Sequence, residues 1–245
     1  MVKKLKSFLP VWIHLLCRLP KILFIMPLSF AGRATIRQFA LTTGWRSPAE
    51  RIESRAQSVR LEDIVDEPGI RILYPIAQGG DVTTYELYVL NALVKSRRPR
   101  TIFEIGTLHG RTTVNLLESA ERLEELLTLD IMAELPANLF ASHSRADRVK
   151  RIVCDSRNLD TTPHLKRMDL IFIDADHTYN AVVNDSNKAM EMLRPGGVLV
   201  WHDYTVVGGT KRACNEFISQ HPGQRFVQVA DTTFLMMFSA DAHNV

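Results

Sequence analysis

Acidic side chains and histidines recur at the ends of the apolar segments that are expected to form buried strands. Glu104 lies in the first such segment, and Asp130 ends the next one. Asp155-Ser156, Asp174-Ala-Asp176-His177 and His202-Asp203 follow three more. Because parallel strands deliver their carboxyl ends to one edge of a sheet, these groups are expected to converge there. An acid at every strand end is more than solvation of an edge requires, so we interpret the edge as a site that binds a ligand and acts on it.

The turn after Glu104 has the residue types of a cofactor loop. Gly106 and Gly110 permit a tight turn and a close approach to a ligand, although this spacing is also typical of ordinary turns. Asp130 strengthens the interpretation, because a carboxylate there could accept hydrogen bonds from both hydroxyls of a ribose. Glu104 would repel a pyrophosphate, and nicotinamide sites use G-x-G-x-x-G instead. An acid at this turn suits the cationic amino acid end of S-adenosylmethionine (SAM) better.

Residues 80–240 resemble the class I SAM-dependent methyltransferases. Within that class, Phe103-Glu-Ile-Gly-Thr-Leu-His-Gly110 and Ile171-Phe-Ile-Asp-Ala-Asp-His-Thr-Tyr179 are similar to motifs of the group related to catechol and caffeoyl-coenzyme A O-methyltransferases. The Arg194-Pro-Gly-Gly197 turn and a C-terminal hairpin belong to the same pattern. The resemblance implies methyl transfer from SAM to an oxygen of a small-molecule acceptor such as a sugar, a phenol or a lipid-like compound.

The resemblance also implies which residues hold the cofactor. The implied contacts are Glu104, Gly106, Thr107 and Gly110 for the methionine part, Asp130 for the ribose, Asp155 and Ser156 for the adenine, and Asp81 and Val82 in a segment that closes over the cofactor. The last assignment has an alternative, since Gly79-Gly80-Asp81 could simply form a loop and a helix cap.

A divalent metal site is implied as well. The related O-methyltransferases bind magnesium through a carboxylate after the fourth strand and an Asp-Asn pair after the fifth. Asp174 matches the first position, but His202-Asp203 stands in place of the pair. Two carboxylates and an imidazole could hold Mg²⁺ or Mn²⁺, and the imidazole shifts the preference from Mg²⁺ toward Mn²⁺, Fe²⁺ or Zn²⁺. The alternative left open is that His202 bonds to a neighbouring carboxylate and no ion binds.

His177 and Asp174 are the predicted catalytic residues. His177 stands where the magnesium-dependent relatives place a catalytic lysine, and a neutral imidazole could take the proton of an acceptor hydroxyl. Asp174 would act through the metal, which lowers the pKa of a bound oxygen. The transfer itself would be an in-line attack on the SAM methyl group, aided mainly by alignment. Alternatively, Asp176 and His177 cap the following helix and pair with each other.

The elements that must position these groups alternate between strands and helices. Strands are expected over Thr101–Ile105, Leu127–Asp130, Val149–Asp155, Asp169–Asp174 and Val198–Trp201, and helices from Thr83 or Thr84 to Pro99 and over about 112–126, 180–193 and 211–219. The runs 225–229 and 232–238 are too close for a helical crossover and predict an antiparallel hairpin. The pattern predicts an α/β, Rossmann-like, mostly parallel seven-stranded sheet with helices on both faces.

The predicted organisation has three parts: a basic, apolar extension (1–48), a connecting or lid region (49–80) with a helix over 52–60, and a SAM-binding methyltransferase domain (81–245). The extension carries eight Lys or Arg and no acid, whereas the whole chain has a net charge of only +3. Because the excess of positive charge is confined to the extension and the rest of the chain is net acidic, we expect no nucleic-acid partner. The extension either packs on the catalytic domain or a homodimer partner, or makes a peripheral membrane contact.

Cysteine usage and the alternatives complete the expectation. Three widely spaced cysteines without a C-x-x-C pair predict a reducing, cytoplasmic location, with membrane association through the extension left open. The alternative functions are an N- or C-methyltransferase of the same fold and a non-catalytic SAM-fold module that binds a partner through its N-terminal segment.

Overall fold

The computed structural model describes residues 52–65, 69–77 and 81–240. Its helices and strands belong to one compact unit, which lies within Ser47–Ala77 and Val82–Val245. The strands are β1 (Gln57–Val59), β2 (Thr101–Ile105), β3 (Glu125–Asp130), β4 (Val149–Val153), β5 (Met168–Ile173), β6 (Leu193–Trp201), β7 (Arg225–Val229) and β8 (Leu235–Phe238). The α-helices are α3 (Thr84–Arg97), α4 (Arg111–Ser119), α5 (Tyr179–Met192) and α6 (Gly208–Gln220), and short 3-10 turns are η2 (Leu61–Asp63), η3 (Ala146–Arg148), η4 (Ser156–Asn158) and η5 (Thr162–His164).

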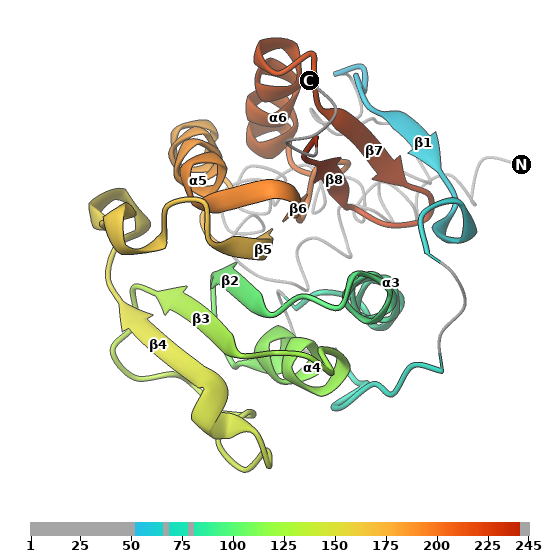
Figure 1. Cartoon of the computed structure of the whole chain (residues 1–245). Helices are drawn as coiled ribbons and strands as arrows, with labels where there is room; N and C mark the ends of the chain where they lie inside the picture. The colour runs from blue at the N-terminus through green and yellow to red at the C-terminus, as the bar shows by residue number, and fades with distance from the viewer. Residues whose placement is uncertain (1–51, 66–68, 78–80, 241–245) are drawn as a thin grey trace, which may run out of the picture. The chain divides into compact units, whose positions relative to one another are not determined.

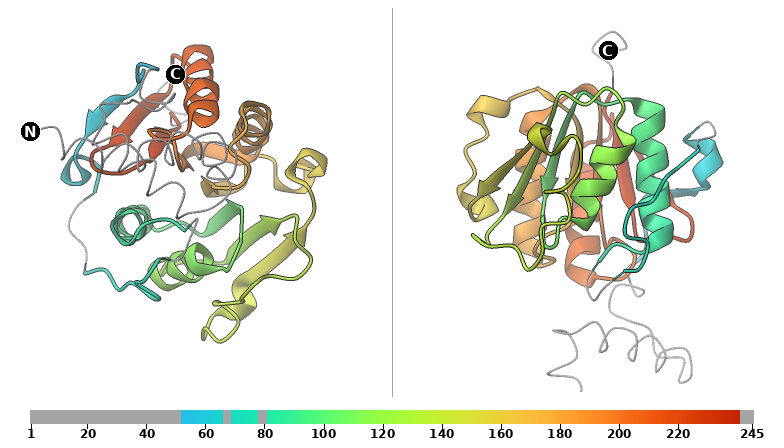
Figure 2. Two further views of the ribbon diagram at one scale, coloured as in Figure 1. Left: turned by 180° about the vertical axis from the view of Figure 1, so that it is seen from behind. Right: turned by 90° about the horizontal axis from the view of Figure 1, so that it is seen from below.

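The eight strands form one sheet in the order β1-β7-β8-β6-β5-β2-β3-β4 (Figure 1). Strand β8 runs antiparallel to both of its neighbours, and all the other pairs are parallel. Helices α3 and α4 cover one face of the sheet and α5 and α6 the other, as the views in Figure 2 also show. The predicted fold class is therefore confirmed, with eight strands in place of seven.

The core is divided by the sheet into two apolar layers. Along β2, Ile102 packs with the buried residues of α3 and α4, whereas Phe103 and Ile105 pack with those of α5 and α6. Because helices cover both faces, the central strands are apolar at nearly every position, and their polar residues are left to the strand ends. This layering is what leaves the carboxyl edge of the sheet available for a site.

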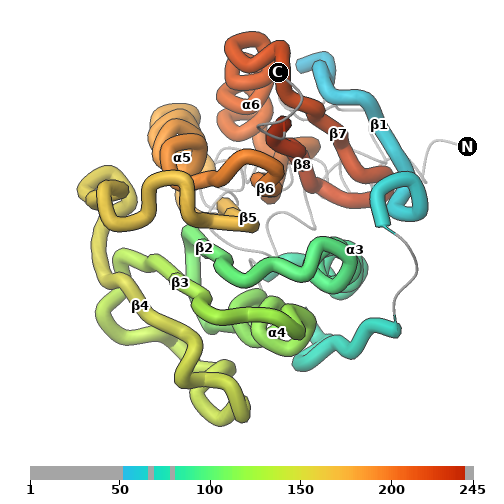
Figure 3. The backbone as a smooth tube through the Cα atoms, viewed as in Figure 1, coloured from blue at the N-terminus to red at the C-terminus, as the bar shows by residue number. Residues whose placement is uncertain are grey.

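The eighth strand corrects the prediction of a helix over residues 52–60. Gln57–Val59 pairs in parallel with Val227–Val229 at the edge of the sheet, and β1 lies beside β7 along the chain trace of Figure 3. The segment is short and polar, so its weak helical pattern cannot outweigh the backbone hydrogen bonds that the open edge of β7 offers.

The helix expected over residues 112–126 is also shorter than predicted. Helix α4 ends at Ser119, and β3 begins at Glu125. Leu126, the last residue of the predicted helix, instead pairs with Ile102 of β2 on one side and with Val149 of β4 on the other, whereas Leu127 lies in a strand as predicted. Pairing on both sides satisfies the backbone groups of Leu126 within the sheet, which explains why local periodicity misplaced this boundary.

Thr83 caps α3, as predicted. Its hydroxyl accepts a hydrogen bond from the backbone N–H of Glu86 at 3.2 Å, and the Glu86 carboxylate accepts one from the backbone N–H of Thr83 at 2.9 Å. This reciprocal arrangement is a capping box.

The predicted extension (1–48) lies outside the described residues, and no helix within the described part of the chain is long and apolar enough to cross a membrane.

Candidate active site

The carboxyl ends of neighbouring strands are joined by backbone hydrogen bonds that bring the predicted residues together. The N–H of Gly106 donates to the carbonyl of Leu129 at 2.8 Å, and the N–H of Asp174 donates to that of Ile105 at 2.8 Å. The N–H of His202 likewise donates to Ile173 at 3.0 Å. The loop after β2, the end of β3 and the residues after β5 and β6 therefore share one edge of the sheet.

Both glycines of the loop are required by its backbone. Gly106 has a φ of +104°, and a Cβ there would lie 1.9 Å from the backbone oxygen of Asp174. Gly110 has a φ of +75°, and a Cβ there would lie 2.6 Å from the Phe140 ring. Only glycine combines these dihedral angles with such close approaches. The loop is thus pressed directly against the backbone of Asp174.

Asp130 holds the glycine loop in place. One oxygen of its carboxylate accepts hydrogen bonds from the backbone N–H groups of Thr107 (3.0 Å) and Leu108 (2.9 Å). The other oxygen accepts one from Met132 at 2.9 Å. A carboxylate oxygen can accept more than one hydrogen bond. The second oxygen therefore retains capacity for a ribose hydroxyl, the role predicted for Asp130.

Glu104 lies differently from what its sequence position suggested. It shares the sheet face of Ile102, and its carboxyl group is fully buried between Thr113 of α4 and Thr128 of β3, both of which donate hydrogen bonds to one of its oxygens. Burial raises the pKa of this carboxyl group to about 8. The expectation of an anion facing the cationic end of the cofactor is therefore corrected: Glu104 is a mostly neutral acid at pH 7, inside the core.

Of the other predicted cofactor residues, Asp155 and Ser156 occupy their expected strand end, and all contacts to SAM stay predictions. Asp155 follows β4 and accepts hydrogen bonds from the backbone (2.9 Å) and side chain (3.0 Å) of Arg157, which lowers its pKa to about 2. Ser156 begins η4, and its carbonyl accepts a bond from Lys188 at 2.7 Å. Val82 is buried directly before α3, and Asp81 is the described residue that precedes it.

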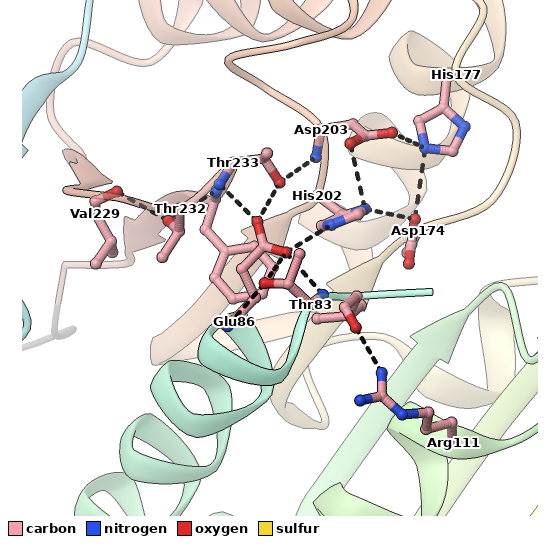
Figure 4. A network of polar contacts seen from close by, with 12 residues as sticks. Thr83, Glu86, Arg111, Asp174, His177, His202, Asp203, Val229, Thr232 and Thr233 are labelled. Atoms are coloured by element: carbon pink, nitrogen blue, oxygen red, sulfur yellow. Dashed lines mark hydrogen bonds and ion pairs between the residues drawn. The ribbon is translucent and has the colours of Figure 1, made fainter. Parts of the chain in front are cut away.

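Four side chains after β5 and β6 form a carboxylate–histidine cluster, comprising Asp174, His177, His202 and Asp203 (Figure 4). Nδ1 of His202 lies 3.0 Å from an Asp174 oxygen. Nε2 of His177 lies 2.9 Å from Asp203 and 3.4 Å from Asp174, without the directed geometry of a hydrogen bond. The sequence therefore named all four members, and the structure brings them together.

The alternative pairing of Asp176 with His177 is not what the structure shows. The Asp176 carboxylate accepts a hydrogen bond from the backbone N–H of Thr178 at 2.9 Å, while His177 turns toward Asp174 and Asp203. His177 is also the most exposed member of the cluster, with 27% of its side chain accessible against 5% for Asp203. It is therefore the member that a ligand at the edge of the sheet reaches first.

The electrostatics of the cluster favour charged imidazoles in the absence of a cation. Although burial opposes the charge, the carboxylates of Asp174 and Asp203 raise the pKa of His177 to about 9. The pKa of His202 is likewise held well above its ordinary value by Asp174, against the effect of burial. A histidine protonated in this way cannot accept a proton at neutral pH, which restricts the predicted role of His177 as a base.

Glu86 of α3 is a member of this network that the sequence did not identify. It is 2% exposed, and one of its oxygens lies 3.4 Å from Nε2 of His202. The hydrogen bond with His202 lowers its pKa to about 2 despite burial. The capping-box pattern Thr83-x-x-Glu86 was visible in the sequence, but it predicts only a helix start and says nothing of a partner on β6.

The donor atoms of the cluster suit a divalent cation. One donor atom from each of Asp174, His177 and His202 can be chosen so that all lie within 4.8 Å of one another. Mixed carboxylate and imidazole donors are typical ligands of Mn²⁺, Fe²⁺ and Zn²⁺. The predicted ligand set of Asp174, His202 and Asp203 thus overlaps this group, and His177 is a further candidate ligand.

Comparison with known proteins agrees with this geometry. Residues 103–204 match the family model described as a methyltransferase domain. An uncharacterized protein (R132) of Acanthamoeba polyphaga mimivirus is 33% identical over 116 residues, which are 42% of this chain and 51% of that protein. The chain therefore spans about half the length of this curated relative.

Solved structures share the fold. The O-methyltransferase TomG of Streptomyces achromogenes, solved with SAM, superposes with a TM-score of 0.53 at 21% identity, over 65% of this chain and 82% of TomG. An O-methyltransferase of Bacillus cereus in complex with SAH gives 0.53 at 24% identity, over 65% and 83%. A putative caffeoyl-CoA O-methyltransferase of Staphylococcus aureus gives 0.54 at 16% identity, over 64% and 83%.

The fold class predicted from the sequence is confirmed by these solved structures. Residues 103–204 match a methyltransferase domain, and the described part of the chain shares the fold of the solved O-methyltransferases.

Proposed function

We propose that the chain transfers the methyl group of SAM to an oxygen of a small-molecule acceptor, assisted by a divalent cation at the carboxylate–histidine cluster. The observation that supports this most directly is the contact between the two halves of the site. Gly106 of the cofactor loop packs against the backbone of Asp174, whose side chain belongs to the cluster. A methyl donor held by the loop and an acceptor held at the cluster would therefore be neighbours.

The loop residues would bind and orient the methyl donor. Asp130 fixes the backbone of Thr107 and Leu108 and retains an oxygen for a ribose hydroxyl. Gly106 and Gly110 would place the loop backbone against the methionine part. Because methyl transfer is an in-line displacement, rate enhancement comes mainly from holding donor and acceptor in alignment, which suits a loop tied down at both ends.

Asp174, His202 and Asp203 would hold the cation, with His177 beside it. A divalent cation bound there would lower the pKa of an acceptor hydroxyl and so favour the oxygen nucleophile. A hydroxyl acceptor needs this help to lose its proton, whereas a neutral amine attacks without prior loss of a proton. A cation site therefore favours oxygen over nitrogen as the methyl acceptor. His177 is the accessible group that would receive the hydroxyl proton once it is itself neutral.

A methylation assay with a matched metal-site variant tests the proposal. The enzyme is incubated with SAM and a panel of hydroxylated small molecules, and products are detected by a mass increase of one methyl group. Activity should fall after chelation, return with Mn²⁺ or Mg²⁺, and be lost in Asp203→Ala. Calorimetry with SAM and with NAD checks the cofactor. Absence of SAM binding at high micromolar concentration refutes the proposal, and full activity of Asp203→Ala in chelator refutes its metal part.

The N-terminal extension (residues 1–48) supports a proposal about the location of the enzyme in the cell. Its eight basic residues and apolar stretches would associate a cytoplasmic enzyme with an anionic membrane surface, or with a second copy of the chain. Salt-sensitive liposome binding that disappears when residues 1–48 are deleted would support the membrane contact. A change from dimer to monomer in the same deletion, with no liposome binding by the full chain, would support the dimer instead.

A further inference from the structure

The His202–Asp203 pair is held from outside the cluster by one carboxylate. Each oxygen of Glu86 receives donors from a different element of the fold. One oxygen accepts the backbone N–H and the hydroxyl of Thr233, both at 2.7 Å. The other accepts the backbone N–H and the hydroxyl of Thr83, at 2.9 and 2.8 Å, and faces Nε2 of His202. Figure 4 shows Glu86 between these three residues.

The link to Asp203 runs through Thr233. The Thr233 hydroxyl donates to Glu86 and accepts a hydrogen bond from the backbone N–H of Asp203 at 3.1 Å. Asp203 has a φ of +59°, in the left-handed region that residues other than glycine adopt at a cost. The Glu86–Thr233 pair thus supports the backbone of Asp203 in a conformation that the residue does not prefer.

The link to His202 concerns which ring nitrogen faces the cluster. Nδ1 lies 3.0 Å from Asp174, and Nε2 lies on the opposite side of the ring against Glu86. An imidazole that ligates a metal through one nitrogen commonly donates its other N–H to a carboxylate, which fixes the tautomer and the ring orientation. Glu86 stands where such a carboxylate would stand.

We propose that Glu86 is the positioning residue of the His202–Asp203 pair and fixes both members for a divalent cation. It orients the His202 ring so that Nδ1 faces Asp174, and it holds the Asp203 backbone through Thr233. This inference rests on the proposed cation at the cluster. Glu86 itself lies behind His202 and is not proposed as a ligand.

Helix capping is the competing role, and matched variants separate the two. Glu86→Gln keeps the size of the side chain but replaces one acceptor oxygen by a donor. Thr83→Val removes the cap hydroxyl and leaves Glu86 against His202, whereas Thr233→Val removes only the bridge to Asp203. Affinity for Mn²⁺ is measured from the free-ion signal in electron paramagnetic resonance, without SAM or acceptor. Thermal unfolding of each variant reports on the fold.

Positioning predicts a weakening of Mn²⁺ binding by roughly 10- to 100-fold in Glu86→Gln, and a smaller weakening in Thr233→Val. Thr83→Val should bind Mn²⁺ within about twofold of wild type while it unfolds at a lower temperature. Equal affinities in wild type and folded Glu86→Gln would overturn the proposal. Equal losses in Glu86→Gln and Thr83→Val would overturn it too, because they would trace the effect to the helix cap.

A measurement on the wild-type protein decides the matter even if Glu86→Gln does not fold. Nitrogen-15 correlation spectra of the histidine rings, recorded with the diamagnetic probe Zn²⁺ bound, should show His202 protonated at Nε2 and unprotonated at Nδ1. The reverse pattern overturns the proposal, and so does a wild type that binds neither ion. None of these measurements depends on methylation. A protein that binds Mn²⁺ as expected but methylates nothing in the activity assay would therefore refute the proposed function and leave this inference standing.

Discussion

Replacement of Glu104 by glutamine tests whether a neutral acid sits beneath the cofactor loop. The amide has nearly the same shape and keeps one oxygen for the hydroxyls of Thr113 and Thr128, which donate to a single oxygen of Glu104. The other oxygen of Glu104 is buried without a hydrogen-bond partner. The substitution therefore removes the ionisable group and leaves its one set of hydrogen bonds in place.

The magnitude follows from the pKa of the buried group. Burial raises the pKa of Glu104 from 4.5 to about 8, so the folded state binds this proton more tightly than the unfolded state between those values. The contribution of this proton to the free energy of unfolding is therefore fully present below pH 4.5 and is lost as the pH rises toward 8. One pKa unit corresponds to about 1.4 kcal/mol, so the whole loss is roughly 5 kcal/mol, of which about 3 kcal/mol falls between pH 6 and pH 9.

Urea unfolding at pH 6 and at pH 9 measures this difference. The free energy of unfolding of wild type should fall by about 3 kcal/mol more than that of Glu104→Gln over this interval, because all other titrating groups are common to both proteins. Glu134→Gln, at an exposed position, should behave like wild type. A wild type and a Glu104→Gln variant that lose stability in parallel would show that Glu104 is ionised in the folded protein, and the reasoning would fail.

Three further predictions concern the cofactor loop and the cluster. Asp130→Asn should weaken SAM binding about tenfold in calorimetry, because a charged acceptor is lost, whereas Asp147→Asn at an exposed position should not. Gly106→Ala should lower the free energy of unfolding by at least about 3 kcal/mol, since its Cβ would meet the Asp174 backbone, while Gly223→Ala, with open space around it, should change it by less than about 1 kcal/mol. Below pH 9, Mn²⁺ binding to the cluster should release protons, so the Mn²⁺ affinity should rise by up to about tenfold per pH unit for each proton released. Calorimetry in buffers of different ionisation enthalpy would reveal the released protons as binding heats that depend on the buffer. Heats that do not depend on the buffer would contradict the last of these.

The strand ends were predictable because a parallel sheet converts sequence order into spatial proximity. Asp174 and His202 are distant in the chain, yet the adjacency of β5 and β6 brings their side chains to 3.0 Å. Side-chain direction was less predictable. Glu104 alternates with Phe103 and Ile105, so its position in the strand turns it toward α4 and into the core.

Contacts between one layer of the fold and another could not be predicted from the sequence. Glu86 follows the helical period of α3, and only the packing of α3 against the β7–β8 turn reveals its contact with Thr233. The short strand β1 likewise depends on the free edge of β7, which no local pattern announces. Local chemistry predicts where a residue type is useful, but partners supplied by a distant layer appear only when the layers are assembled.

The charges of the cluster and of the neighbouring Glu86, taken together, indicate why the fold need not depend on a bound ion. Glu86, Asp174 and Asp203 contribute three negative charges, and two protonated imidazoles offset two of them, which leaves a net charge of −1. A divalent cation that displaced both protons would leave the same net charge. The imidazolium groups thus neutralise the buried carboxylates in the ion-free protein, whereas structural zinc sites need their metal to fold. Proton and cation would compete for one site, so the state of the cluster would be set by pH and ion concentration together.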